Sequence, residues 1–391
     1  MTLAMNFKPN SRVAQVVPRL CAIIFVASLA GCSTVSGWFG SKKIEPKPLA
    51  PNVVVLGVRQ AWTAKIPSVG FSLTPAVQGD TLTLASDDGT VTALDGRTGR
   101  ELWRASAGAP LSAGVGTDGT LTTVVSRNNE IVAFAQGRQS WRAKLSAEAF
   151  TAPLVAGGRV FVLAADRSVS AYDGQSGRKL WTQQRPGGEP LVLRHSGVLL
   201  AMGNTLVVGL SGRLSGLDPD NGSLRWEAPV AAPRGTNDVE RLVDLVGRVS
   251  RLDGVICTRA FQAAVGCVDA TRGQTLWSRP ASGYTGVDGD DTRIFGTESN
   301  GVVNAWRRRD GERAWSVDRL QYRHLSAPLV LGRSVVFGDA DGLVHFLSRE
   351  DGAPLNRLTT DGSAITTAPV EVGGSLVVVT KNGGVFGFVP D

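Results

Sequence analysis

The stretch Thr90–Arg104, TVTALDGRTGRELWR, decides the fold because recognisable copies of it return along the chain. It holds an alternating apolar segment, a D-x-x-T-G turn and a second segment that carries Leu-Trp. Asp95 and Thr98 can hydrogen-bond to turn amides, and Gly99 supplies the positive φ of a tight reversal, so the pattern predicts a β-hairpin. A lone hairpin cannot bury the indole of Trp103, which must therefore pack against a neighbouring copy.

The spacing of the copies predicts the architecture. Successive tryptophans are separated by 41, 38, 40, 45, 51 and 38 residues, and Asn356 stands 41 residues after the last of them. A period of ~40 to 45 residues with strand patterns is typical of propeller blades, each a four-stranded antiparallel sheet. We therefore predict an all-β, eight-bladed β-propeller. The tryptophans expected to dock its blades are Trp62, Trp103, Trp141, Trp181, Trp226, Trp277 and Trp315.

The two ends of the chain predict how the ring closes. After Asn356 only three strand patterns remain, so the last blade lacks its outermost strand. The segment around Trp62 carries a tryptophan with no hairpin before it. We expect this N-terminal strand to complete the final blade, since pairing both edges removes an exposed strand that could aggregate.

The first residues are an export signal rather than part of the fold. Lys8, Arg12 and Arg19 precede a short apolar run that is too short to span a membrane comfortably. The run ends in Leu-Ala-Gly-Cys, which resembles the lipobox of bacterial lipoproteins, and this resemblance implies cleavage before Cys32 and lipidation of that residue. An ordinary signal peptide with a chance cysteine is the alternative. The predicted organisation is a signal peptide over 1–31, a lipidated N-terminus with a flexible Lys- and Pro-rich tether over 32–51, and the propeller over 52–391.

Charge and composition point away from nucleic acid. Removing the three basic residues of the signal lowers Lys and Arg from 41 to 38, against 34 Asp and Glu, which leaves a formal charge of +4. This balance is mild, and no nucleic-acid motif accompanies it. His195, His324 and His345 are isolated in sequence, without the spacing of a zinc site. The aspartates at 288, 290 and 291 resemble the start of a calcium loop, but Arg293 stands where that loop needs glycine, so we expect a solvated turn and no metal or other cofactor.

Two cysteines lie in the body of the chain. Cys257 and Cys267 are equally distant from Gln262, so they face each other if Gln262 is the apex of a hairpin. An exported protein meets oxidising conditions, which makes a cross-strand disulfide one reading. Two small buried thiols are the other reading.

The fourth and fifth blades depart from the regular repeat. They follow insertions at 185–198 and 230–248, and inserted residues in repeat folds map to loops and binding faces. Two insertions on adjacent blades can form one surface. Blade 6 carries Arg307, Arg308 and Arg309 at its hairpin turn, which we read as a solvated turn rather than a contact for an acidic partner. Blade 7 has Asn356 in place of tryptophan, so its packing is expected to be weaker or differently filled.

The repeated A-x-D-x-x-T-G-x-x-L-W copies at 93–103 and 171–181 resemble the propellers of quinone-dependent dehydrogenases. A lipobox followed by one such ring is similar to the BamB family, lipoproteins of the machinery that assembles β-barrels in Gram-negative outer membranes. The resemblance covers nearly the whole mature chain. It implies a non-enzymatic scaffold on the periplasmic side of the outer membrane, monomeric within a larger complex.

In the BamB family an L-x-L-R insertion and an E/D-R-L-x-D-x-D segment bind a periplasmic POTRA domain of the BamA protein. The resemblance implies the same role for Leu191, Leu193 and Arg194, and for Glu240, Arg241 and Asp244. The last acidic position of the second segment is Val246 here, a departure from the family pattern. Apolar residues with a charged rim also suit an interface on general grounds. Alternatively, Leu191 and Leu193 are ordinary strand residues that alternate into a sheet.

Two other functions remain open at this point. One is a quinoprotein dehydrogenase, although that family has a disulfide of adjacent cysteines, whereas the pair here is ten residues apart. The other is a generic propeller scaffold for a different envelope partner. Exposed strand edges could also bind unfolded outer-membrane proteins by strand addition.

Overall fold

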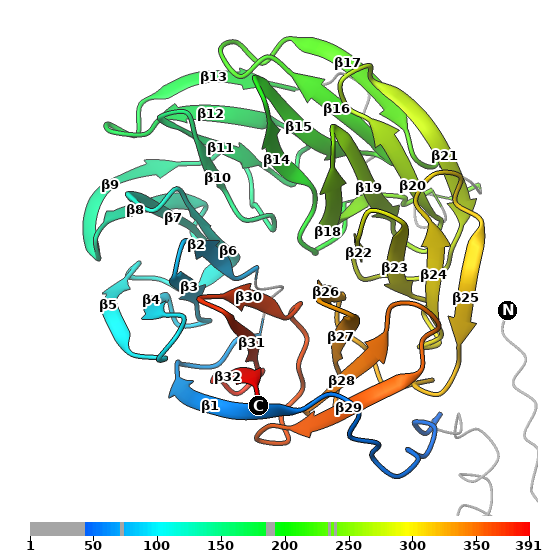
Figure 1. Ribbon diagram of the computed structural model, residues 1–391. Coiled ribbons are helices and arrows are strands. Elements are labelled where there is room, and N and C mark those ends of the chain that lie inside the picture. Colours follow the sequence, from blue (N-terminus) through cyan, green and yellow to red (C-terminus); the bar gives the residue numbers. More distant parts are fainter. Residues whose placement is uncertain (1–43, 71–73, 185–191, 234–235, 238–240) are drawn as a thin grey trace, which may run out of the picture. The chain divides into compact units, whose positions relative to one another are not determined.

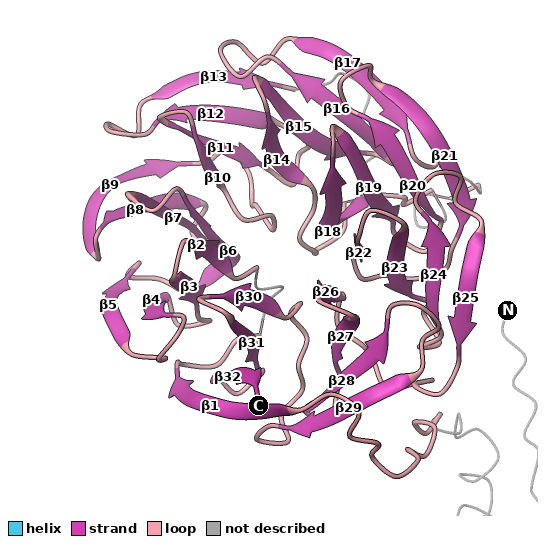
Figure 2. Ribbon diagram, viewed as in Figure 1, coloured by secondary structure: helices cyan, strands magenta, loops and turns pink. Residues whose placement is uncertain are grey.

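The computed structural model describes residues 44–70, 74–184, 192–233, 236–237 and 241–391. The chain divides into Met1–Glu45 and Pro46–Asp391, and the second unit contains every described strand. Within the described residues the strands form eight four-stranded antiparallel sheets, and no helix is present. Figure 2 shows that these sheets are arranged in a ring. No helix in that part of the chain could therefore cross a membrane. The predicted eight-bladed β-propeller is confirmed.

Blades 1 to 4 follow one another along the chain, each beginning with its innermost strand (Figure 1). Blade 1 contains β2 (Ala76–Gln78), β3 (Thr81–Ala85), β4 (Thr90–Asp95) and β5 (Glu101–Ser106). Blade 2 contains β6 (Leu111–Thr117), β7 (Leu121–Ser126), β8 (Glu130–Ala135) and β9 (Arg138–Lys144). Blade 3 contains β10 (Leu154–Ala156), β11 (Arg159–Leu163), β12 (Val169–Asp173) and β13 (Lys179–Gln183). Blade 4 contains β14 (Leu199–Met202), β15 (Thr205–Leu210), β16 (Arg213–Leu217) and β17 (Leu224–Pro229).

Blades 5 to 7 repeat the same order of strands. Blade 5 contains β18 (Leu245–Leu252), β19 (Val255–Ala260), β20 (Ala264–Asp269) and β21 (Gln274–Pro280). Blade 6 contains β22 (Asp288–Gly289), β23 (Arg293–Thr297), β24 (Val303–Arg307) and β25 (Arg313–Val317). Blade 7 contains β26 (Leu329–Leu331), β27 (Ser334–Gly338), β28 (Leu343–Ser348) and β29 (Pro354–Thr359).

Blade 8 closes the ring with strands from both ends of the chain. Its first three strands are β30 (Val370–Val372), β31 (Ser375–Val379) and β32 (Gly384–Pro390), and its outermost strand is β1 (Val58–Lys65). β1 pairs antiparallel with β32, which places Trp62 opposite Gly387. The predicted closure by an N-terminal strand is therefore confirmed.

The antiparallel order assigns each connection to one of two faces of the ring. Every outermost strand ends on the face where the next innermost strand begins, so all linkers between blades lie there, and we call it the linker face. The turns between second and third strands also lie on the linker face, because two antiparallel strands return the chain to it. The turns between third and fourth strands, which carry the D-x-x-T-G pattern, lie on the opposite face.

Tryptophans join neighbouring blades around most of the ring. Each indole lies against a positive-φ glycine in the next blade, in the turn between its third and fourth strands. The pairs are Trp62–Gly99, Trp103–Gly137, Trp141–Gly177, Trp181–Gly222, Trp226–Gly273, Trp277–Gly311 and Trp315–Gly352. Several of the indoles also donate a hydrogen bond to that turn, for example from Trp141 Nε1 to Gly174 O at 2.8 Å. The residue opposite each tryptophan on the adjacent strand is small, as with Ala133 opposite Trp141, so the indole can lie flat across the sheet.

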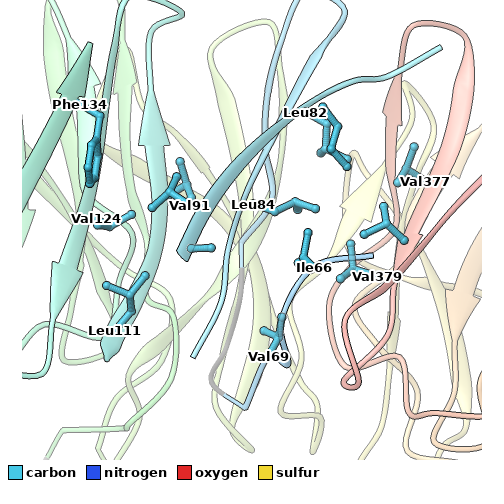
Figure 3. Packing of buried hydrophobic residues seen from close by; sticks show 14 of the residues in the cluster. Ile66, Val69, Leu82, Leu84, Val91, Leu111, Val124, Phe134, Val377 and Val379 are labelled. Carbon is cyan, nitrogen blue, oxygen red and sulfur yellow. The ribbon is translucent and has the colours of Figure 1, made fainter. Parts of the chain in front are cut away.

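Between the sheets, buried aliphatic side chains form the core. Figure 3 shows Leu82, Leu84 and Val91 of blade 1 between residues of blade 2 and blade 8. Phe134 lies on the side of blade 2, and Val377 and Val379 lie on the side of blade 8. Blade 1 therefore buries both of its faces against its neighbours, as expected for a repeat that cannot bury its apolar faces alone.

Residues before β1 run along the outer edge of blade 7. Val55 N and Leu56 N both donate to Leu355 O, at 2.8 and 3.2 Å, and Lys47 N donates to Gln321 O at 3.0 Å. Arg357 Nη1 donates to Ala50 O at 3.1 Å. Contacts with the ring therefore begin at Lys47, inside the stretch expected to be tether, and we call residues 47–56 the strap.

The cysteine pair lies in blade 5. Cys257 on β19 faces Cys267 on β20, and the two sulfur atoms are bonded at 1.90 Å. Cys267 is also the small residue opposite Trp277. Both residues are fully buried, so the disulfide is part of the packing between blades 5 and 6.

The expectation of solvated turns was wrong for Arg308 and Asp288. Arg308 is 8% exposed and donates from Nε to Asp290 O at 2.6 Å and from Nη2 to Ser250 Oγ. Asp288 accepts from Arg248 Nη2 at 2.8 Å and from Val330 N at 2.9 Å, so it joins blades 5, 6 and 7. Burial without partners would be costly for either charge, and these contacts supply the partners.

Candidate functional site

The two inserted linkers meet on the linker face. Leu193 N, in the linker that leads into blade 4, donates to Asp244 Oδ2 at 3.0 Å, in the linker that leads into blade 5. Arg167 Nη1, from the turn between β11 and β12 of blade 3, donates to Asp244 Oδ1 at 2.7 Å. One carboxylate therefore joins elements from three successive blades. The structure brings together Leu193 and Asp244, which the sequence places 51 residues apart.

Arg167 occupies a backbone position that several other blades give to glycine. Its φ is +63°, and its amide donates to Ala164 O at 3.0 Å. Gly89, Gly301 and Gly342 make the same turn in blades 1, 6 and 7. A left-handed conformation is unfavourable for a residue with a Cβ, by about 1–2 kcal/mol. The ion pair with Asp244 requires a long cationic side chain at this point, and only a residue other than glycine can supply it.

Asp244 organises this surface from inside the protein. It is 8% exposed, and both carboxylate oxygens accept hydrogen bonds from the chain itself. Its carbonyl also accepts from Phe261 N at 2.9 Å, in the turn between β19 and β20. Breaking a buried ion pair by removing one partner is costly, about 3–5 kcal/mol, because the other charge is left uncompensated. The sequence analysis grouped Asp244 with residues that contact a partner. In the structure it is buried and holds the two inserted linkers and the Arg167 turn in place.

Arg194 is the exposed member of the site. Its side chain is 77% exposed and contacts Glu148 Oε2 through Nη2 at 3.1 Å. Its guanidinium lies over the ring of Phe150, with 5.4 Å between Cζ and the ring centroid. Stacking of this kind holds the guanidinium plane in one orientation while its edge remains open to solvent.

Leu193 lies half-buried over a small cavity. The cavity has a volume of about 40 Å³, and its lining includes Phe150, Arg167, Leu210 and Asp244. Leu193 follows the residues that the structure leaves undescribed and precedes β14 by several positions, so the reading of it as an ordinary strand residue is wrong. An apolar side chain at the edge of a hollow, next to an exposed arginine, has the composition of an interface centre with a charged rim.

The remaining members of the predicted site are described less fully. Leu191 and Glu240 lie outside the described residues. Arg241 is exposed, and its amide donates to Asn237 O at 3.1 Å. Cys32, the predicted lipidation site, also lies outside the described residues.

Val246, the departure from the family pattern, is buried on β18 directly opposite Arg259 on β19. The guanidinium of Arg259 is fully buried, and none of its nitrogen atoms has a hydrogen-bond partner within the described residues. Burial lowers the pKa of Arg259 to about 10, and attraction from Glu298 opposes this effect. A carboxylate at position 246 would face this cation, so the substitution by valine leaves a buried charge without a partner on the neighbouring strand.

Three residues of the site were missed by the sequence analysis, namely Glu148, Phe150 and Arg167. Arg167 had a detectable signal, since Asp-Arg-Ser replaces the Asp-Gly or Asn-Gly of most of the equivalent turns. Glu148 and Phe150 lie in the linker between blades 2 and 3 and had no such signal. Among the described residues, no group of three His, Cys, Asp or Glu side chains is arranged to hold a metal ion.

Comparisons with known proteins agree with this architecture. The family model described as outer membrane protein assembly factor BamB matches residues 87–317. A protein of that name from Burkholderia pseudomallei (strain K96243) is 39% identical over 377 residues, which cover 95% of this chain and 97% of the relative. A second, from Bordetella pertussis (strain Tohama I), is 34% identical and covers 96% of this chain and 97% of its own length.

A solved structure has the same fold. The crystal structure of BamB from Moraxella catarrhalis superimposes with a TM-score of 0.77 at 24% sequence identity. It covers 85% of this chain and 99% of that protein. At 24% identity this structure supports only the fold, whereas the two more similar relatives above establish the family.

Proposed function

Because the chain belongs to the family of outer membrane protein assembly factor BamB, we propose that it is a non-catalytic scaffold subunit of the complex that assembles β-barrel proteins in the outer membrane. The relatives are named as assembly factors, and the sequence match covers nearly their whole length. The protein works at the outer membrane and holds other components of the complex rather than converting a substrate.

The partner is a POTRA domain of a BamA-like protein, and it docks on the linker face at Leu193, Arg194 and Arg241, with Leu191 and Glu240 completing the contact. One observation carries this proposal. The Asp244 carboxylate holds the two inserted linkers and the Arg167 turn together. A surface assembled before the partner arrives loses less conformational entropy on binding.

The residues divide into two roles. Leu193 and Arg194 contact the partner. Leu193 lies at the edge of the small cavity, and Arg194 is largely exposed. Asp244 and Arg167 are positioning residues, since both are buried and bonded to each other. A few residues near the centre of an interface commonly carry most of the binding energy, and arginine is frequent among them.

The anchor is a lipid on Cys32, with a tether that ends where the strap begins at Lys47. Such a lipid holds the ring at the periplasmic face of the outer membrane, close to the membrane-embedded part of the complex. Unfolded outer-membrane proteins are a further class of partner, which would add an extended strand to an exposed edge of a blade.

Capture of native complexes tests the site. Leu193→Asp with Arg194→Glu, in the full-length lipoprotein, should abolish capture of the BamA-like protein from solubilised outer membranes. The variant should keep the circular-dichroism spectrum and melting temperature of the wild type, because neither side chain is fully buried. A matched control is Leu180→Asp with Arg178→Glu, on and beside the outer strand of blade 3, which should leave capture unchanged. Retained capture by the first variant would refute this placement of the partner.

A separate assay tests the absence of catalysis. The purified protein is supplied with pyrroloquinoline quinone and calcium and assayed for dye-linked oxidation of alcohols. We expect no activity above that of the mixture without protein. Turnover that saturates with substrate would show that the non-catalytic proposal is wrong.

A further inference from the structure

A hollow of about 380 Å³ opens beside Arg194 on the linker face. Its lining includes Ser112 and Arg127 of blade 2, Glu148 and Phe150 of the next linker, and Arg194. The hollow therefore extends the proposed docking surface toward blade 2, away from the second inserted linker.

The charges in this hollow are unbalanced. Two guanidinium groups line it, and Glu148 is the one carboxylate among the lining residues. Arg194 contacts Glu148 through Nη2 alone, and Arg127 donates from Nε to Leu111 O at 3.2 Å. Within the described residues, the other guanidinium nitrogens of these two arginines have no hydrogen-bond partner. The hollow therefore offers open cationic donors to an incoming anion.

We propose that this hollow receives an acidic side chain, Asp or Glu, from the protein that docks on the linker face, and that Glu148 occupies its place in the free protein. This inference rests on the proposed function and adds two residues to it, Arg127 as a second cation and Glu148 as an internal competitor. A carboxylate matches the geometry of a guanidinium edge and can bind it through two parallel hydrogen bonds.

Exchange of one carboxylate for another is inexpensive here. Arg194 and Glu148 are 77% and 41% exposed at their side chains, and exposed ion pairs contribute only about 0–1 kcal/mol. Phe150 holds the guanidinium in place when Glu148 leaves, because stacking does not involve the hydrogen-bonding edge. The partner's carboxylate gains Arg127 as well, whereas no contact between Glu148 and Arg127 is formed in the free protein.

Binding of the purified periplasmic region of the BamA-like protein to the full-length lipoprotein in detergent tests this directly. Glu148→Gln removes the competitor and should tighten binding by about two- to fivefold, the range that corresponds to an exposed pair. Arg127→Gln should weaken binding by a similar factor and reduce its dependence on salt, because one cation is lost from the interface. The matched control is Glu101→Gln, which breaks an exposed pair with Arg104 on the outer strand of blade 1 and should change neither quantity.

The outcomes separate this inference from the proposed function. If Leu193→Asp with Arg194→Glu abolishes binding while Glu148→Gln and Arg127→Gln bind like the wild type, the docking site stands and the role of the hollow is refuted. If the double variant still binds, the site itself is misplaced. Inorganic phosphate that binds the free protein without lowering its affinity for the partner would also overturn the inference, because the hollow would then be an anion site unrelated to docking.

Discussion

Seven contacts between blades use tryptophan, and the contact between blades 7 and 8 does not. At the seven, a large indole lies opposite a small residue, as Trp315 lies opposite Ala305. At blade 7 the sizes are exchanged, because Asn356 lies opposite Phe346. The aromatic ring has moved to the neighbouring strand, and we call this contact the closing seam.

The reason for the exchange is the way the ring closes. An indole from blade 7 would dock on the turn between the third and fourth strands of blade 8. In the described residues no turn joins these two strands of blade 8, because the third strand is β32 and the fourth is β1, which comes from the N-terminal part of the chain. At that end of blade 8, Asp391 N donates to Gly57 O at 3.3 Å, and Gly57 lacks the positive φ of the glycines that receive an indole elsewhere. The tryptophan is therefore absent where its docking turn is absent.

Other residues fill the closing seam. Phe346 is 1% exposed and packs in one cluster with Leu355 and Phe388, against which Leu56 and Val58 also pack. Asn356 Nδ2 donates to Leu56 O at 2.8 Å, so the polar side chain holds the end of the strap. The filling is incomplete, because a hollow of about 380 Å³ remains beside Phe346 and Phe388. The comparison shows that a blade carries the repeat's tryptophan where the next blade offers a turn that can receive the indole. Where that turn is missing, other residues fill the contact.

The largest expected effect comes from Phe346→Ala, which removes the aromatic ring of the closing seam. Truncation of a buried phenylalanine costs about 3–5 kcal/mol, because apolar contacts are lost and a cavity remains. Unfolding in urea, followed by tryptophan fluorescence, should show a lower midpoint. Tyr322→Ala, at an exposed aromatic residue of the linker into blade 7, is the control and should cost less than about 1 kcal/mol. Equal costs for the two variants would mean that Phe346 does not replace the missing indole.

An intermediate effect is expected where an indole docks. Gly177→Ala places a methyl group against the ring of Trp141 at a φ of +69°. Gly157→Ala has a similar φ of +58° with no atom within 4 Å of the new methyl. The control should therefore cost only the backbone penalty of about 1–2 kcal/mol. The docked glycine should cost a further ~1–3 kcal/mol for overpacking. Thermal unfolding of both variants measures the difference, and equal melting temperatures would show that the indole yields without cost.

The sequence was informative about the ring because its signals are local. Turn residues, strand alternation and one tryptophan per repeat each report the chemistry of a single hairpin, and their spacing counts the blades. The equal distances of Cys257 and Cys267 from Gln262 gave the register that the structure shows. The same reasoning could note the absence of tryptophan at Asn356, but it could not identify Phe346 as the compensating residue, since many apolar residues alternate along that strand.

Contacts between blades were beyond the sequence. Arg167 and Asp244 are 77 residues apart and lie in elements of different blades, so no local pattern pairs them. The run Arg307 to Arg309 looked like a solvated turn, yet its middle member points inward to Asp290 and Ser250. A run of like charges in the sequence gives the charge of the turn but not the direction of each side chain. Which of the three arginines is buried depends on how neighbouring blades pack around the turn.

The smallest expected effect is a change in how the melting temperature depends on pH, and it compares a buried carboxylate of blade 7 with a carboxylate at a docking turn. Burial alone would raise the pKa of Asp339 in blade 7, but hydrogen bonds from His345, Leu343 N and Arg323 outweigh it and hold the pKa below its ordinary value. The folded pKa is thus below the unfolded one, so this carboxylate stabilises the protein above pH ~4 and the contribution is lost as the pH falls further. Arg323 also donates to Lys47 O, which links the carboxylate to the strap. Asp339→Asn should lower the melting temperature at pH 7 and flatten its fall between pH 5 and 3, whereas Asp173→Asn, at an exposed docking turn, should change the profile much less. If the melting temperatures of the wild type and Asp339→Asn fell in parallel with pH, the loss of stability in acid would come from groups other than Asp339.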